Sequence, residues 1–222
     1  MTHFILPAAA RRLGAAVLLG TAAALTLPAC APLVVGGAVA GSALVATDRR
    51  TSGAQLEDQG IELRGANRVR EQLGERGSIN INSYNRQVLL TGEVPTEQDK
   101  AQVEKIVAGV DNVVSVVNEL AVQGSSSFSQ RSSDTLLTGQ VKAVLVDARD
   151  LHSNAFKVTT RRGTVYLMGR VTQREADRAT EIIRNISGVQ RVVRLLEIIS
   201  EAELARMLPQ PAPEQKADPA AK

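Results

Sequence analysis

The thiol and imidazole groups that most often serve as nucleophiles, bases or metal ligands are scarce in this sequence of 222 residues. There is one cysteine, Cys30, and the two histidines are His3 and His152. Catalysis requires reactive groups that converge on one site, and these three residues show no metal-ligand or nucleophile–base spacing. His152 lies in a polar stretch, which is typical of a solvated residue. The sequence therefore predicts no catalytic residue, no metal site and no cofactor.

The position of Cys30 in the chain indicates its role. Residues 1–12 are basic, and residues 13–27 are apolar but too short to span a bilayer comfortably, which is the pattern of a secretory signal. They lead into Leu27-Pro28-Ala29-Cys30, which resembles the lipobox of bacterial lipoproteins. That resemblance implies that the thiol carries diacylglycerol and that a signal peptide, residues 1–29, is cut off before it. The other common role of a lone cysteine, a small buried apolar side chain, does not explain why it ends the apolar segment.

The segment after Cys30 is expected to be a tether. Residues 31–47 are apolar, but there are only 17 of them and they include a proline and three glycines, whereas a spanning helix needs about 20 residues. The polar stretch 48–60 favours a linker. Residue 31 is alanine, while lipoproteins retained in the inner membrane usually have aspartate there. The sequence therefore predicts a lipidated N-terminus and tether over residues 30–57, and a location at the outer membrane, facing the periplasm.

The rest of the chain contains an internal repeat. Residues 79–94 align with residues 156–171 at an offset of 77, and their apolar and glycine positions coincide. The matched pairs are Ile79–Phe156, Ile81–Val158, Val88–Val165, Leu90–Leu167, Gly92–Gly169 and Val94–Val171. Further along, Gly109-Val110 aligns with Gly188-Val189 at an offset of 79. Two copies of one structural unit are therefore expected.

Each copy is expected to contain a helix, a hairpin, a second helix and a third strand. Alternating apolar residues on either side of a polar turn predict two half-buried strands, the second ending at Gly92 or Gly169. The expected helices cover about 58–73 and 96–107 in the first copy, and 134–146 and 172–186 in the second. The third strands, 113–117 and 189–196, are apolar enough to predict burial. A strand–helix–strand connection requires parallel pairing. The fold class is therefore α+β: two tandem small α-β-β-α-β domains, each a three-stranded mixed sheet packed against two helices.

The repeated pattern, V-x-L-x-G-x-V followed by a helix and then G-V-x-x-V, resembles the BON domain family. The first copy carries it as Val88, Leu90, Gly92, Val94, Gly109, Val110 and Val113, and the second as Val165, Leu167, Gly169, Val171, Gly188, Val189 and Val192. Two copies in the same order behind a lipobox are a specific signal, and they imply a dual-BON outer-membrane lipoprotein. The expected organisation is a first BON domain over 58–122, a Ser-rich linker over 123–132, a second BON domain over 133–199 and a disordered tail over 200–222.

The two copies differ in charge. Residues 61–122 contain 7 Lys/Arg and 9 Asp/Glu, whereas residues 131–199 contain 12 Lys/Arg and 7 Asp/Glu. A basic surface attracts anionic lipid by roughly 1 kcal/mol for each Lys or Arg near the membrane, although solvated arginines on an ordinary surface remain the alternative. An exported chain with little net charge after removal of the signal is not expected to bind nucleic acid.

The first helix of the second copy has an unusual outer face. Its inward residues are expected to be Leu137, Val141, Val144 and Leu145, while apolar or small residues also lie on the opposite side, where a soluble helix is normally polar. The predicted phospholipid-binding residues on and beside that outer face are Arg131, Leu136, Gly139, Lys142, Ala143 and Val146. The corresponding face of the first copy is ordinary and polar, with Arg64, Asn67, Arg68 and Glu71.

These observations predict a protein without enzymatic activity that binds anionic phospholipid of the outer membrane through its second BON domain. The family resemblance implies a contribution to envelope integrity. The alternative is a periplasmic adaptor whose face docks on an outer-membrane β-barrel protein or its assembly machinery. The two hypotheses differ in the expected partner, which is lipid in the first and protein in the second.

The lipid anchor can be tested at the thiol itself. Cys30→Ala removes the sulfur that would carry diacylglycerol, so we expect the protein to remain uncleaved or to become soluble in the periplasm. Fractionation of membranes on a density gradient, followed by detection of the protein, measures the outcome. Unchanged recovery with the outer membrane would show that Cys30 is not the point of attachment.

Overall fold

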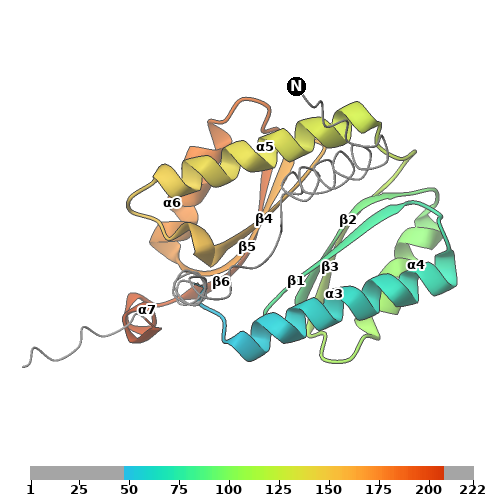
Figure 1. Cartoon of the computed structure of the whole chain (residues 1–222), viewed down its shortest axis with the longest axis horizontal. Coiled ribbons are helices and arrows are strands. Elements are labelled where there is room, and N and C mark those ends of the chain that lie inside the picture. The colour runs from blue at the N-terminus through green and yellow to red at the C-terminus, as the bar shows by residue number, and fades with distance from the viewer. Residues whose placement is uncertain (1–47, 208–222) are drawn as a thin grey trace, which may run out of the picture. The chain divides into compact units, whose positions relative to one another are not determined.

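The computed structural model describes residues 48–207, and these contain two three-stranded sheets with their helices (Figure 1). The first copy consists of α3 (Ser52–Leu73), β1 (Ser78–Tyr84), β2 (Gln87–Val94), α4 (Glu97–Ala108) and β3 (Ser115–Val122). The second consists of α5 (Phe128–Asp147), a short 3-10 turn (Ser153–Ala155), β4 (Phe156–Arg161), β5 (Thr164–Thr172), α6 (Gln173–Arg184) and β6 (Arg191–Ile199), followed by α7 (Glu201–Met207). The predicted signal peptide, Cys30, most of the tether and the tail beyond residue 207 lie outside the described residues.

The sheet topology confirms the predicted α-β-β-α-β unit. In each copy the hairpin strands pair antiparallel, and the strand after the second helix pairs parallel to the middle strand. The strand orders are β1-β2-β3 and β4-β5-β6, so β3 and β6 are edge strands. The third strands begin two residues later than predicted, at Ser115 and Arg191. The prediction that they are buried was wrong for most of their residues, which are exposed or only partly buried. Each of these strands has a hydrogen-bonded neighbour on one edge only, so its apolar residues are less covered than those of a middle strand.

One face of each sheet is covered by the two helices of its own copy. In the first copy this core joins Ile61 and Val69 of α3 to alternate residues of β2, such as Val88 and Leu90, and to Val107 of α4. The second copy repeats the arrangement with Leu137, Val141 and Leu145 of α5, Val165 and Leu167 of β5, and Ile183 of α6. The inward stripe predicted for the second copy is therefore confirmed for Leu137, Val141 and Leu145, whereas Val144 is only partly buried.

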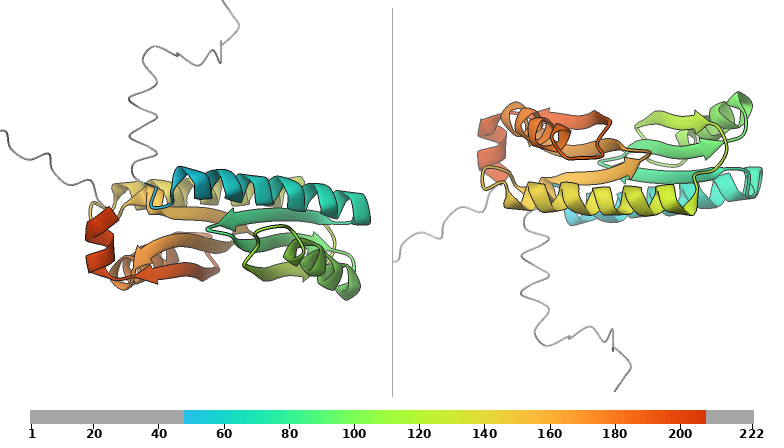
Figure 2. Two further views of the ribbon diagram at one scale, coloured as in Figure 1. Left: turned by 90° about the horizontal axis from the view of Figure 1, so that it is seen from below. Right: turned by 90° about the horizontal axis from the view of Figure 1, so that it is seen from above.

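The helix-free faces of the two sheets pack against each other. Their shared core contains Tyr84 and Leu89 of the first copy and Tyr166, Met168 and Leu195 of the second, all at most 9% exposed. Four layers result, with the two sheets between two pairs of helices, as Figure 1 shows. Figure 2 looks along the stack, with α3 in front in the view from below and α5 in front in the view from above. The middle strands β2 and β5, expected to be half-buried, are consequently buried on both faces.

The predicted linkers are partly helical. Helix α3 begins at Ser52 with Thr51 as its N-cap, inside the expected tether over 30–57. Helix α5 begins at Phe128 with Ser127 as its N-cap, inside the Ser-rich linker predicted over 123–132. The error has a physical cause, because serine and threonine favour both flexible segments and helix N-caps. Similarly, α7 occupies the start of the predicted tail 200–222 and buries Leu204.

Gly92 and Gly169 lie within the middle strands and not at their ends. Gly92 pairs with Ile79, the second residue of β1, and Gly169 pairs with Phe156, the first residue of β4. A β-carbon on Gly169 would lie 2.4 Å from the carbonyl oxygen of Ala155, and one on Gly92 would come still closer to that of Ser78. These glycines therefore allow two backbones to approach closely.

Substitution of the strand glycine should destabilise the second copy. Gly169→Val places a branched side chain against the backbone of Ala155, so we expect a loss of more than ~1 kcal/mol in the free energy of unfolding. Urea denaturation followed by circular dichroism measures it. Gly139→Ala, at an exposed helix position with no atom within 4 Å of the added carbon, serves as the control and should be neutral or slightly stabilising. Equal stability of Gly169→Val and the parent would refute the steric role.

Candidate phospholipid-binding face

The outer face of α5 is exposed, as the sequence predicted. Arg131, Leu136, Gly139, Lys142, Ala143 and Val146 all lie on the solvent side of the helix, while its buried apolar side chains point to the sheet. Leu136 is 71% exposed and Val146 67% exposed. An exposed leucine alone needs no explanation. Here two large apolar side chains share one helix face with two cations. Of the two acids of α5, Asp134 is buried and Asp147 lies at the end of the helix beside Val146.

Phe128 belongs to the same face and was missed from the sequence. It is 79% exposed, more than any other large apolar side chain among residues 48–207. At about 100° per residue, Phe128 and Val146 point in the same direction five turns apart, and Gly139 lies between them in nearly the same direction. The face therefore extends for about 27 Å along the helix. The signal was in the sequence, but placing residues 123–132 in a linker removed Phe128 from the helix.

The corresponding helix of the first copy is less polar than expected. Arg64 and Arg68 of α3 do not simply face water, because they donate hydrogen bonds to carbonyl oxygens of the loop after α4, at Asp111 and Gly109 respectively. The exposed apolar residues of α3 are Leu56 and Leu63, at 69% and 65%. Glu57 and Glu62, both partly exposed, are adjacent to them in sequence. Exposed apolar side chains thus occur on both helices. On α5 they are accompanied by Arg131 and Lys142, and the exposed acid of that helix, Asp147, lies at its end beside Val146.

The opposite charges of the two copies meet at the interface between them. Three ion pairs cross it: Glu62–Lys157, Glu93–Arg162 and Glu119–Arg191. In each pair the acid belongs to the first copy and the base to the second. The difference in charge, interpreted from the sequence as attraction to lipid, is therefore explained in part by complementarity between the domains. Arg131 and Lys142 have no part in these pairs and remain exposed.

Glu93 is the most deeply buried acid of that interface. Its side chain is 1% exposed, accepts a hydrogen bond from the Ser126 hydroxyl at 2.5 Å, and lies 3.0 Å from the Arg162 guanidinium. Burial alone would raise the pKa of Glu93, but the hydrogen bonds from Ser126 and Arg162 outweigh it, so the pKa lies below its ordinary value of 4.5. The carboxylate is therefore charged in the folded protein at neutral pH.

A buried aspartate from the first helix holds the hairpin turn in each copy. Asp58 accepts hydrogen bonds from the amides of Asn85 and Arg86, and Asp134 accepts them from the amides of Arg162 and Gly163. These turn residues all have positive φ, a conformation that non-glycine residues rarely adopt without support. The carboxylates supply that support. The sequence held a signal for this, since the two aspartates are 76 residues apart and the turns 77.

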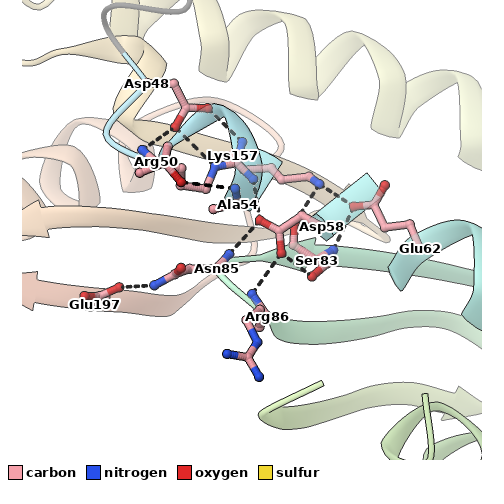
Figure 3. A network of polar contacts seen from close by, with 11 residues as sticks. Asp48, Arg50, Ala54, Asp58, Glu62, Ser83, Asn85, Arg86, Lys157 and Glu197 are labelled. Atoms are coloured by element: carbon pink, nitrogen blue, oxygen red, sulfur yellow. Dashed lines mark hydrogen bonds and ion pairs between the residues drawn. The ribbon is translucent and has the colours of Figure 1, made fainter. Parts of the chain in front are cut away.

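A groove of about 590 Å³ runs beside α5 (Figure 3 shows part of its wall). Lys142 and Val146 line it from α5, and Glu62 lines it from α3. Lys157, which also lines the groove, pairs with Glu62 and donates to the carbonyl of Ser83. The polar groups around Lys157 therefore satisfy one another and hold the two copies together.

The described residues contain no group of three or more His, Cys, Asp or Glu side chains that could hold a metal ion. His152 is half exposed, with Nδ1 3.8 Å from Glu175, as expected of a loop residue. None of the helices between residues 48 and 207 is long and apolar enough to cross a membrane.

Tandem copies of this α-β-β-α-β unit define a repeat protein whose two units are stabilised by each other. A profile of the BON domain family matches residues 66–124 and 133–200, together more than half of the sequence. The chain belongs to the BON domain family. It is 40% identical over 187 residues to the outer membrane lipoprotein DolP of Haemophilus influenzae, which covers 83% of this chain and 95% of that protein. With its lipobox, the chain is accordingly a lipid-anchored protein of the outer membrane.

Two further similarities are weaker. The chain is 31% identical to a 21 kDa hemolysin of Actinobacillus pleuropneumoniae over 154 residues, which are 68% of this chain and 79% of that protein. Among solved structures, the C-terminal domain of CdsD from Chlamydia trachomatis covers 60% of this chain and 96% of its own length at 13% identity, with a TM-score of 0.28. That score is too low to support any conclusion.

The buried acids predict sensitivity to acid. A lowered pKa in the folded state means that Glu93 stabilises the fold above its ordinary pKa of 4.5, and that this contribution is lost as pH falls through the folded value. Glu93→Gln should cost about 2 kcal/mol in the free energy of unfolding at pH 7 and make unfolding less dependent on pH below 4.5. Urea denaturation across a pH series measures both. Glu71→Gln, exposed on α3, is the control, and an equal effect of both variants would contradict the assignment.

Proposed function

We propose that the second BON domain binds anionic phospholipid through the outer face of α5, and that this contact supports outer-membrane integrity. One observation carries the proposal: Phe128, Leu136 and Val146 are large, exposed and on one face of a single helix, with Arg131 and Lys142 beside them. A helix that presents aromatic and aliphatic side chains together with cations suits the boundary between headgroups and acyl chains. The similarity to an outer membrane lipoprotein supports a location beside a bilayer, where such a surface would be used.

The expected affinity of the face alone is modest. Each cation near an anionic surface contributes roughly 1 kcal/mol, and the three apolar side chains add up to about 2 kcal/mol each if they are fully buried. Partial insertion and the loss of rotational freedom reduce that total. A lipid anchor changes the situation, because it holds the domain at a high local concentration beside the bilayer. Weak contact by the face is then sufficient for stable occupancy.

The test should use both domains together. A fragment containing only the second copy would expose Tyr166, Met168 and Leu195, which the first copy covers, and these residues would bind vesicles for an unrelated reason. The mature sequence with Cys30→Ser keeps the interface and removes the anchor. We expect it to bind vesicles that contain phosphatidylglycerol and not vesicles of phosphatidylcholine alone.

Charge on the face should abolish binding without unfolding the protein. Phe128→Glu, Leu136→Glu and Val146→Glu each remove insertion and add repulsion, and we expect binding to anionic vesicles to fall at least about tenfold. Arg131→Glu and Lys142→Glu should weaken binding in a manner that depends on salt. Vesicle co-sedimentation measures affinity, and thermal unfolding confirms the fold.

Leu63→Glu is the matched control, because Leu63 is exposed to a similar degree on the helix of the first copy. It should leave binding unchanged. In cells that lack the protein, Leu63→Glu should restore detergent resistance. The glutamate variants of Phe128, Leu136 and Val146 should not. If the three glutamate variants bind anionic vesicles like the parent, α5 is not the lipid site. The adaptor hypothesis, with an outer-membrane β-barrel protein or its assembly machinery as partner, would then remain.

A further inference from the structure

Two consecutive arginines precede α3 and contact different copies. Residues 48–51, here called the lead-in, connect the segment that follows Cys30 to the first turn of α3. Arg49 donates to both carboxylate oxygens of Glu175 in α6, each at 2.7 Å, and to the carbonyl oxygen of Arg170 at 2.9 Å. The side chains of Arg49 and Glu175 are 5% and 1% exposed. The lead-in is therefore bonded directly to the second copy.

The next residue binds the first copy, as Figure 3 shows. The Arg50 guanidinium lies 2.8 Å from Asp58 of α3 and 2.7 Å from Asp48 within the lead-in. It also stacks over the Tyr84 ring, with 4.2 Å between its central carbon and the ring centroid, a favourable cation–π arrangement. Asp58 is the carboxylate that holds the first hairpin turn, and Tyr84 belongs to the core between the sheets. Arg50 therefore attaches the lead-in to structural residues of the first copy.

Burial of the Arg49 guanidinium is costly, because the group loses its hydration. Only several well-oriented hydrogen bonds compensate for that loss. Arg49 has three, including the two-pronged contact that arginine makes with a carboxylate. Glu175 also accepts from the Thr172 amide in the capping box of α6. Replacing such a pair by apolar residues is often neutral for stability. The role that we assign to the pair is therefore the specific orientation that it imposes.

That orientation concerns the lipid anchor. Chain order connects the anchor to the first copy through α3, whereas the proposed lipid face lies on α5 of the second copy. Arg49 gives the anchored segment a direct connection to the second copy. The lead-in also lies close to the proposed face, because Asp48 and Arg50 line the same groove as Lys142 and Val146.

We propose that Arg49 and Arg50 form a clasp that binds the anchored segment to both BON domains and thereby holds the second domain in the orientation that brings α5 to the bilayer. The orienting role rests on the proposed function of α5, whereas the clasp itself does not. Arg49 is a positioning residue that contacts no lipid. Its loss should leave the lipid face intact and change only how that face is presented.

The clasp is tested in the mature, lipidated protein in phosphatidylglycerol vesicles. Thr47→Cys, immediately before the lead-in, and Ser187→Cys provide two thiols for spin labels, since the native thiol is predicted to be acylated. Electron paramagnetic resonance gives the distance between the labels, and the distribution of the parent is the reference. With Arg49→Gln the distribution should become about twofold wider or more, as for a flexible linker. Glu175→Gln should act alike, since glutamine still completes a capping box but lacks the charge.

Arg174→Gln is the matched control. Arg174 lies on the same turn of α6, but it and its partner Glu201 are both more than half exposed, 3.6 Å apart. It should leave the distribution as wide as in the parent. If Arg49→Gln does so as well, the clasp does not hold the anchored segment and the proposal is wrong.

A second measurement addresses orientation. A fluorophore at Thr135→Cys, on the outer side of α5, is quenched by brominated lipid when that helix lies on the bilayer. Arg49→Gln should reduce quenching about twofold in the anchored protein. The same change should leave the vesicle affinity of the unanchored Cys30→Ser form unchanged, because the clasp affects how the anchored domain is oriented and not how tightly α5 binds lipid. Unchanged quenching would refute the orienting role. An anchored parent that is not quenched at all would refute the lipid face, while the distance measurement still decides the clasp.

Discussion

The helix-free faces of the two sheets bury each other, and the remaining features depend on that contact. A three-stranded sheet covered by helices on one side leaves an apolar face on the other, here formed by Tyr84 and Leu89 in one copy and Tyr166, Met168 and Leu195 in the second. Exposed patches of this kind are rare on soluble proteins. Each copy covers the apolar sheet face of the other. A single copy would leave that face exposed to water. The outward helices then remain available for other contacts.

Much of this could be predicted from sequence because the repeat was visible. The coincidence of Val88, Leu90 and Gly92 with Val165, Leu167 and Gly169 gave both the strands and their order. The inward stripe of α5 and the exposure of Leu136 and Val146 followed from helical periodicity and are confirmed. Local pattern was sufficient wherever a residue's environment was decided within its own copy.

Prediction from the sequence was wrong or incomplete where a residue's environment depends on the other copy, or where a helix boundary depends on a single N-cap residue. No local pattern shows that Leu89 faces a second sheet, or that Arg162 pairs with Glu93, 69 positions away. Ser127 caps α5, yet a serine in a run of serines is also typical of a flexible linker. That ambiguity concealed Phe128. The excess of arginine in the second copy was correctly noticed. Part of it pairs with the first copy, through Arg162 and Arg191, and more of it pairs within the second copy and the helix that follows, through Arg170, Arg174, Arg178 and Arg194.

The direction of the interfacial charges has a consequence for symmetry. Homologous units often associate as two-fold pairs, in which one surface meets an identical surface. Here every acid of the three crossing ion pairs is on one unit and every base on the other, so two second units placed face to face would oppose like charges. The interface therefore has a polarity and specifies a pseudodimer, complete within one polypeptide. Neighbouring molecules crowded on a membrane are discouraged from pairing identical units through these sheets.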